Sequence, residues 1–256
     1  MTAIHALILG LIEGLTEFLP ISSTFHLIWT STLLHLSQSD FQKTFEIIIQ
    51  SGAILAVLTL YLPTLLHDWQ LDKKLLASFI PTAIIGFLLY KLIKNSFFTD
   101  SNLQLVVFAS IGILFILLDK IRPHSFLSKS LNDLTYPQAI FVGLAQAFAV
   151  VPGVSRAGAV IVALLFLNFR RDEAARYSFL LALPTIVAAS SLDIYKSHSL
   201  IMAQSSHLLP LIIGFITAFI SALLVINWFT HYLKNHTLTS FGWYRLILTI
   251  FLLFLK

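Results

Sequence analysis

The stretch "GLIEGLTEFLPISSTFH", residues 10–26, decides the fold, because it places charges and a helix-breaking proline inside an apolar block. Glu13 and Glu17 stand four residues apart, so on a helix both carboxylates lie on one face. Pro20 interrupts that helix, because proline has no backbone N–H to donate. Hydroxyl residues follow at positions 22–24. The stretch therefore predicts two half-helices with polar groups gathered at the break.

The rest of the chain has the composition of a membrane protein. Of its 256 residues, 57% are hydrophobic and 11% are charged, whereas a soluble domain carries roughly 25% charged residues. Long apolar runs at 207–230 and 241–255 are expected to be membrane spans. The net charge is +4, but the basic residues are scattered between apolar runs as in membrane loops, which argues against a nucleic-acid partner.

A second broken block, "GLAQAFAVVPGVSRAG" from Gly143, resembles the first. In each block Gly-Leu is followed by a polar residue, which is Glu13 in the first and Gln146 in the second. Each block then has a proline with a serine three residues later, Ser23 or Ser155. The segments "PTAIIGFLLYK" and "PTIVAASSLDIYK" form a weaker pair. Together these similarities predict an internal repeat, with chance similarity between Leu- and Ala-rich segments as the alternative.

Each half of a broken block is too short to cross a bilayer, so each block is predicted to be a re-entrant helical hairpin. Six spans are expected at about 43–62, 75–94, 103–120, 174–194, 207–230 and 241–255. Three crossings after each hairpin would invert the second half relative to the first. The predicted fold is an all-α polytopic membrane protein with two inverted repeats, each a re-entrant hairpin plus three transmembrane helices. It is a single domain, 1–256, with repeat one at about 1–120 and repeat two at about 133–256.

The distribution of basic residues predicts the orientation. Ten fall on the side opposite the N-terminus: Lys73, Lys74, Lys120, Arg122, Lys129, Arg170, Arg171, Arg176, Lys234 and Arg245. Five fall on the N-terminal side: Lys43, Lys91, Lys94, Lys196 and Lys256. Because cytoplasmic loops are enriched in Lys and Arg, both termini and the mouth of the first hairpin are expected to face outward. Arg156 is the only basic residue expected at membrane depth.

Glu13 and Glu17 are the strongest indication of function. Ionisable groups at membrane depth cost several kcal/mol unless they are paired or hydrated. Two neighbouring carboxylates need a cation, a proton or an arginine, and Arg156 in the second block is the candidate arginine. The alternative is that both glutamates lie at the membrane interface and are solvated.

The hydroxyls after the prolines predict an anion site. The candidates are Ser22, Ser23, Thr24 and Ser155. Helix capping explains any one of them, but two inverted hairpins would bring two helix N-termini, with free N–H groups and positive dipoles, to one place. Gly153 permits close approach of the backbone, and the guanidinium of Arg156 suits phosphate oxygens. The pattern therefore predicts a phosphate site near the membrane midplane.

Three further polar residues are candidates for the same cavity. His26, three residues after Ser23, is a candidate general acid or base, with a polar filler as the alternative. Glu46 and Gln50 stand four residues apart just inside the first span. Either they line the cavity or, equally well, they are hydrated by water at the helix end.

The segments "EGLTEFLPISSTFH", "KTFEIIIQSGAILAV" and "PGVSRAGA" resemble undecaprenyl-diphosphate phosphatases of the bacitracin-resistance type, and the resemblance covers nearly the whole chain. It implies a bacterial plasma-membrane enzyme that converts undecaprenyl diphosphate to undecaprenyl phosphate and inorganic phosphate. This reaction recycles the lipid carrier of cell-wall synthesis, and bacitracin is linked to it only indirectly, through the shared substrate. The resemblance also implies a divalent cation, Mg²⁺ or Ca²⁺. Whether the enzyme forms a homodimer is left open.

Carried over by position, the family's catalytic residues fall on Glu13, Glu17, Ser23, His26 and Arg156, with the cation on Glu13 and Glu17. Substrate-binding positions are expected at Ser22, Thr24, Gln50, Gly153 and Ser155. Three positions depart from the family pattern: Phe25 replaces a glycine, and Ala157 and Val160 replace hydroxyl residues. The last two departures remove possible phosphate donors but leave the carboxylates, Ser23, His26 and Arg156.

Two mechanisms and one different function remain open at this point. Either Ser23 attacks the terminal phosphorus, assisted by His26 or a glutamate, or a metal-bound water does. The alternative function is a transporter or flippase of a phosphorylated polyprenyl lipid, which inverted repeats and midplane charges would serve equally well.

Overall fold

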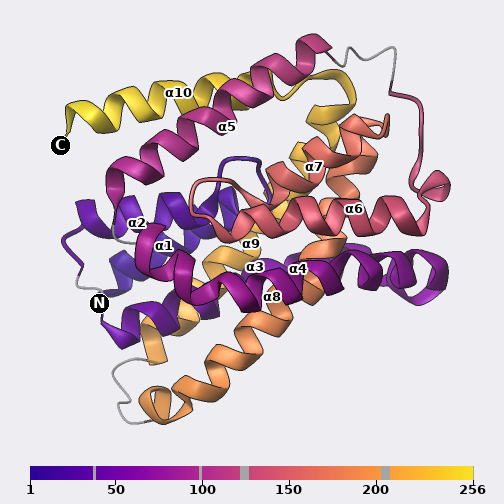
Figure 1. Ribbon diagram of the computed structural model, residues 1–256. Coiled ribbons are helices and arrows are strands. Elements are labelled where there is room, and N and C mark those ends of the chain that lie inside the picture. The colour runs from indigo at the N-terminus through magenta and orange to yellow at the C-terminus, as the bar shows by residue number, and fades with distance from the viewer. Residues whose placement is uncertain (37–38, 98–99, 122–126, 203–207, 256) are drawn as a thin grey trace.

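The computed structural model describes residues 1–36, 39–97, 100–121, 127–202 and 208–255 (Figure 1). Within these ranges the structure is helical and contains no β-strand, only one isolated bridge between Lys129 and Phe169. The first five helices are α1 (Ala3–Thr16), α2 (Ser23–Leu33), α3 (Asp40–His67), α4 (Trp69–Phe97) and α5 (Ser101–Ile121). The other five are α6 (Tyr136–Ala147), α7 (Arg156–Phe166), α8 (Arg171–Met202), α9 (Leu208–Asn235) and α10 (Thr239–Phe254). The all-α prediction is confirmed.

Both broken blocks are broken where the sequence predicts. The first forms α1 and α2, of 14 and 11 residues, with Pro20 in the connection. The second forms α6 and α7, of 12 and 11 residues, joined by a 3₁₀ turn at Phe148–Val150 and a bend containing Pro152. None of these four helices reaches the roughly 20 residues that a bilayer crossing requires.

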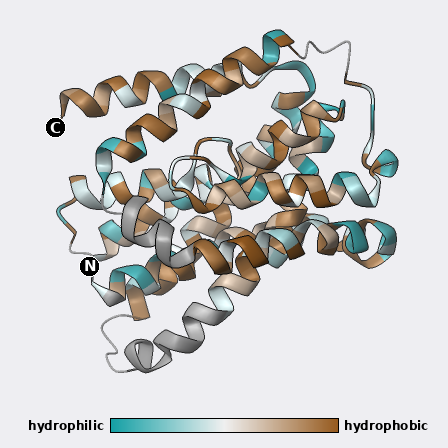
Figure 2. Ribbon diagram, viewed as in Figure 1, coloured by the Kyte–Doolittle hydropathy of each residue, from teal (hydrophilic) through white to brown (hydrophobic). Residues whose placement is uncertain are grey.

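Three helices of the described ranges are long and apolar enough to cross a membrane: Phe41–His67, Ser101–Ile121 and Leu208–Asn235. The other three predicted spans also form helices, namely α4, α8 and α10. Large apolar side chains such as Phe87, Leu224 and Ile247 are exposed on α4, α9 and α10, and Figure 2 shows hydrophobic residues along much of the length of the helices. An outer surface of this kind suits hydrocarbon rather than water, so the chain is a membrane protein.

Small residues let the helices of the broken blocks approach the long helices closely. α1 packs on α9, where Gly10 meets the backbone of Gly214. α6 packs on α4, where Gly143 meets the backbone of Ser78. A Cβ atom at either glycine would collide with a carbonyl oxygen, so glycine is required at both crossings.

The structure corrects the expected positions of the basic residues. Arg245 does not lie on a loop: its side chain is fully buried, at 0% exposure, within α10. Arg156 is therefore not the only basic residue at depth, and the earlier set of ten loses one member. The expectations for Lys91, Lys94, Lys196, Arg122 and Lys256 fall on side chains outside the described residues.

The weaker sequence similarity does not join equivalent helices. Pro81 lies in α4, the second long helix after its broken block, whereas Pro184 lies in α8, the first after its own. This pair therefore gives no support to a repeat.

Candidate active site

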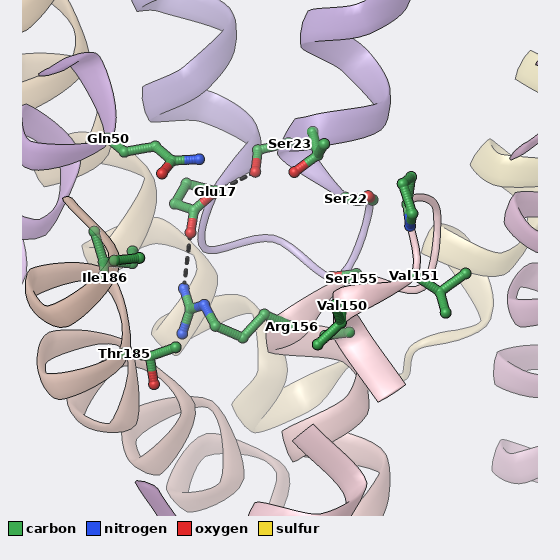
Figure 3. A pocket seen from close by; sticks show the side chains of 14 residues that line it. Glu17, Ser22, Ser23, Gln50, Val150, Val151, Ser155, Arg156, Thr185 and Ile186 are labelled. Atoms are coloured by element: carbon green, nitrogen blue, oxygen red, sulfur yellow. Dashed lines mark hydrogen bonds and ion pairs between the residues drawn. The ribbon is translucent and has the colours of Figure 1, made fainter. Parts of the chain in front are cut away.

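A cavity of about 200 Å³ lies where the two broken blocks meet (Figure 3). Its walls come from the α1–α2 connection and the start of α2, from α3, from the 3₁₀ turn with the start of α7, and from α8. The lining residues are Glu17, Ser22, Ser23, Thr24, Gln50, Ala149, Val150, Val151, Pro152, Ser155, Arg156, Thr185, Ile186 and Ala189. Seven of the ten residues predicted for the site are among them: Glu17, Ser22, Ser23, Thr24, Gln50, Ser155 and Arg156.

Glu17 is the centre of the polar network in this cavity. Its Oε2 accepts a hydrogen bond from the hydroxyl of Ser23. Its Oε1 accepts from Nη2 of Arg156 at 3.0 Å, across 139 residues of sequence. Figure 3 shows the hydroxyl and the guanidinium approaching the carboxylate from opposite sides. A single carboxylate thus holds a hydroxyl and a guanidinium together.

Arg156 is anchored at both ends of its guanidinium. Besides the ion pair with Glu17, Nη1 donates to the carbonyl oxygen of Ser178 in α8 at 3.1 Å. The side chain is only 12% exposed. The planar fork is therefore fixed in orientation before any anion enters.

The two helix starts share an unusual backbone. Ser22 is the N-cap of α2 with φ 67°, and Ser155 is the N-cap of α7 with φ 73°. Ser22 lies twelve residues after Gly10, and Ser155 lies twelve after Gly143. Ser155 is thus the counterpart of Ser22. The earlier pairing with Ser23 was shifted by one residue, and the true counterpart of Ser23 is Arg156, the first residue of α7.

The two N-cap serines differ in what their hydroxyls do. Ser155 Oγ accepts from the N–H of Gly158 at 3.1 Å and caps α7, as predicted. Ser22 makes no side-chain cap bond, and Ser23 turns its hydroxyl to Glu17 instead. Capping therefore does not account for Ser22 or Ser23, and the first N–H groups of α2 have no side-chain cap.

Glu13 lies close to the cavity but not in its lining. The side chain is fully buried, and neither carboxylate oxygen has a hydrogen-bond partner among the described residues. A buried, unpartnered carboxylate is the kind of group that a cation compensates. The described residues contain no cluster of three or more His, Cys, Asp or Glu side chains placed to hold a metal. Mg²⁺ commonly uses one or two carboxylates together with substrate phosphates and water, so Glu13 and Glu17 fit such an ion.

His26 is near the site but turned away from it. Nδ1 contacts the carbonyl oxygen of Ser22 at 2.8 Å, and Nε2 contacts the hydroxyl of Tyr244 at 2.7 Å. A carbonyl only accepts, so Nδ1 carries the proton and Nε2 accepts from Tyr244. His26 is not among the lining residues, and its ring stacks on Tyr244.

Gly153 and Glu46 also lie outside the lining. Gly153 has φ 98°, which suits glycine, and it faces α5, where a Cβ atom would lie 3.2 Å from the carbonyl oxygen of Gln104. Glu46 accepts a hydrogen bond from Gln42 at 2.9 Å. Of the pair Glu46 and Gln50, only Gln50 reaches the cavity.

Several residues of the site were missed by the sequence analysis. Thr185 and Ile186 line the cavity directly after Pro184, and Thr185 accepts a hydrogen bond from Gln146 at 3.2 Å. The proline of an apolar run directly followed by a hydroxyl residue was the available signal. Arg245 stood as a lone basic residue in an apolar run, the same signal by which Arg156 was found.

Comparison with known proteins shows the family of the chain. The family model described as bacitracin resistance protein BacA matches residues 6–251. A protein of Aquifex aeolicus named undecaprenyl-diphosphatase is 46% identical over 97% of this chain and 96% of its own length. A protein of the same name from Sulfurihydrogenibium sp. is 46% identical over 98% of this chain and 98% of its own length. Another from Bdellovibrio bacteriovorus is 40% identical over 100% of this chain and 96% of its own length. The chain belongs to the bacitracin resistance protein BacA family.

Proposed function

We propose that this protein is an undecaprenyl-diphosphatase, a membrane enzyme that hydrolyses undecaprenyl diphosphate to undecaprenyl phosphate and inorganic phosphate. The observation that carries the proposal is Glu17, whose carboxylate binds the hydroxyl of Ser23 and the guanidinium of Arg156 in one cavity. The relatives named above carry the same activity in their names. Transport is not favoured, because carrying a lipid does not require a hydroxyl bonded to a carboxylate.

The cavity is suited to a diphosphate group. Arg156 offers two N–H groups in a plane, which match two phosphate oxygens. The uncapped first turn of α2 adds backbone N–H groups and the positive end of a helix dipole. Thr24, Gln50 and Thr185 provide further polar groups around the lining. We assign substrate binding to these groups and to Ser22 and Ser155.

The hydrogen bond between Ser23 and Glu17 gives the chemistry. Glu17 accepts the hydroxyl proton as Ser23 Oγ attacks the terminal phosphorus. The bond to the bridging oxygen breaks, and undecaprenyl phosphate leaves. Water then cleaves the serine phosphoester and releases inorganic phosphate. The second route is direct attack by water with Glu17 as the base, and Ser23→Ala separates the two. Glu17 rather than His26 is the base in both, because the hydroxyl of Ser23 donates to Glu17, whereas the ring nitrogens of His26 contact Ser22 and Tyr244.

A divalent cation, Mg²⁺ or Ca²⁺, would be held by Glu13 and Glu17. When bound, it supplies positive charge that neutralises the phosphates. Glu13 is the supporting residue, because its buried carboxylate has no other described partner. His26 holds the start of α2 through the carbonyl of Ser22, and general acid catalysis by His26 stays a prediction.

We further propose that the two broken blocks are re-entrant hairpins within inverted repeats, 1–120 and 133–256. Reciprocal packing supports this arrangement: α1 contacts α9, and its counterpart α6 contacts α4. Helices α5 and α10 cross where Gly112 and Gly242 each face the other's carbonyl oxygen. Such reciprocity is expected of two similar halves related by a pseudo-two-fold axis.

The proposed location is the bacterial plasma membrane, with both termini and the cavity mouth facing outward. The bias of basic residues toward the opposite side supports this orientation even without Arg245. A homodimer is compatible with the fold. Bacitracin then acts on this enzyme only indirectly, through the shared lipid substrate.

The test is release of inorganic phosphate from undecaprenyl diphosphate by the purified protein in detergent, with and without EDTA. Detergent removes the two compartments that transport needs, so phosphate release identifies an enzyme. Arg156→Lys is the control: lysine keeps the charge but loses the planar fork, and we expect it nearly to abolish activity. Wild-type protein that releases no phosphate would overturn the proposal.

A further inference from the structure

Arg245 is fully buried, and its hydrogen bonds to the described residues all go to backbone carbonyls. Its Nε donates to Pro20 at 2.9 Å, and its Nη1 donates to Gly153 at 2.7 Å and to Phe108 at 3.3 Å. Nη2 donates to Val154 at 3.3 Å. The guanidinium also lies over the ring of Phe108, at 4.6 Å from the ring centroid. No carboxylate of the described residues forms an ion pair with it.

The carbonyls of Pro20 and Gly153 occupy the same place in the two turns. Pro20 lies two residues before the N-cap Ser22, and Gly153 lies two residues before the N-cap Ser155. One guanidinium therefore joins the two breaks, which are far apart in sequence, at equivalent points. It does so from α10, a helix that contributes no residue to the cavity lining.

Both turns contain a residue that would not keep its conformation unaided. Ser22 and Ser155 have positive φ, which is unfavourable for residues other than glycine and persists only where surrounding structure holds it. Ser23 and Arg156 directly follow these two serines, and their side chains meet at Glu17. A small shift of either turn would separate the hydroxyl from the guanidinium.

We infer that Arg245 is a positioning residue, which holds the two turns together so that Ser23 and Arg156 converge on Glu17. The inference rests on the proposed hydrolysis for its effect on rate. The expected effect of Arg245 on the position of the turns does not depend on the proposed hydrolysis. Arg245 acts through backbone carbonyls and lines no part of the cavity.

The first measurement compares the kinetics of Arg245→Lys with those of wild type. A lysine ammonium can donate three hydrogen bonds from one point and cannot reach four carbonyls arranged around a plane. We expect kcat to fall at least about tenfold and KM to change less than about threefold, because positioning is lost while the binding groups remain. If Arg245→Lys does not insert, Arg245→Gln, a smaller and uncharged donor, replaces it.

Arg171→Lys is the matched control. Arg171 is also buried, at 1% exposure, but pairs with Asp119 at 2.9 Å and lines no part of the cavity. The Arg171→Lys substitution should lower the unfolding temperature of the protein without lowering kcat more than about twofold. A similar loss of kcat in both variants, or a kcat within about twofold of wild type in Arg245→Lys, would overturn the inference.

The second measurement does not depend on activity. The chain has no cysteine, so spin labels can be placed on Leu33→Cys and Phe166→Cys, at exposed ends of α2 and α7. We expect a narrow distribution of label distances with Arg245 and a broader or shifted one with Arg245→Lys. An unchanged distribution overturns the inference even if kcat falls. If wild type releases no phosphate, the proposed function fails, while a broadened distribution still supports the role of Arg245 in holding the turns.

Discussion

The two breaks, Leu19–Ser23 and Val151–Arg156, have similar backbones and different side chains. Each has an N-cap serine with positive φ, and each offers a carbonyl to Arg245. In the second break the hydroxyl of the N-cap serine accepts a hydrogen bond from a backbone N–H of α7, and the next residue is an arginine. In the first break the helix has no side-chain cap, and the next residue is a serine bonded to a carboxylate.

The preceding helices show the same contrast. Glu13 in α1 and Gln146 in α6 follow Gly-Leu at the same spacing, and both are buried. Gln146 donates to Thr82 at 3.1 Å and to Thr185 at 3.2 Å, whereas the oxygens of Glu13 have no described partner. The comparison teaches that the second half caps its helix and supplies a cation, while the first half supplies carboxylates and a helix start without a side-chain cap.

Replacing Glu17 by glutamine should have the largest effect on this contrast. The amide cannot take the proton of Ser23 and does not form an ion pair with Arg156, so both contacts of the first break are weakened. We expect turnover to fall at least about a thousandfold, or roughly 4 kcal/mol of transition-state stabilisation. Phosphate release in detergent measures it, and turnover above a hundredth of wild type would remove Glu17 from the role of base.

Ser23→Ala asks whether the first break supplies the nucleophile. If Ser23 attacks phosphorus, turnover falls by several hundredfold with KM largely kept, and a serine phosphoester can be trapped in wild type. Asn or Asp at this position should not restore activity, because Ser23 caps no helix here. More than about a tenth of wild-type turnover in Ser23→Ala would leave water as the nucleophile.

Glu13→Gln makes the first half resemble the second. We expect about a hundredfold loss of turnover, roughly 2.7 kcal/mol, and a weaker response to added Mg²⁺ or Ca²⁺. Gln146→Leu is the matched variant and should leave the dependence on the cation unchanged, because the amide of Gln146 carries no charge and its nitrogen already donates to Thr82 and Thr185. Titration of activity with each cation after EDTA treatment measures both, and an unchanged response in Glu13→Gln would contradict the assignment of the cation to this residue.

The smallest effect concerns stability and compares the two N-caps directly. Ser155→Ala removes a cap bond and should cost about 1 kcal/mol of unfolding free energy. Ser22→Ala removes no cap bond and should change it by less than about 0.5 kcal/mol. Unfolding in detergent, followed by circular dichroism, measures both variants. Equal losses would show that the two serines do not differ in capping.

Local sequence determined the helices, the breaks and the type of chemistry. An apolar run forms a helix in a membrane because every backbone group must be satisfied internally. The two breaks contain Pro20 and Pro152, although Pro63, Pro81 and Pro184 lie inside continuous helices. Glu17, Ser23 and Arg156 were found because charged and hydroxyl residues in apolar blocks are costly and require partners. These are properties of short segments, so they could be predicted without knowing which segments meet.

Only the tertiary structure decided how those side chains are shared. In the folded chain the hydroxyl of Ser23 donates to Glu17 instead of capping a helix, and the ring of His26 contacts Tyr244. Glu13 lies outside the cavity lining. The fold also buries Arg245 against Pro20, 225 residues away in sequence. A side chain's partner depends on which segments pack around it, and no local pattern specifies contacts over such separations.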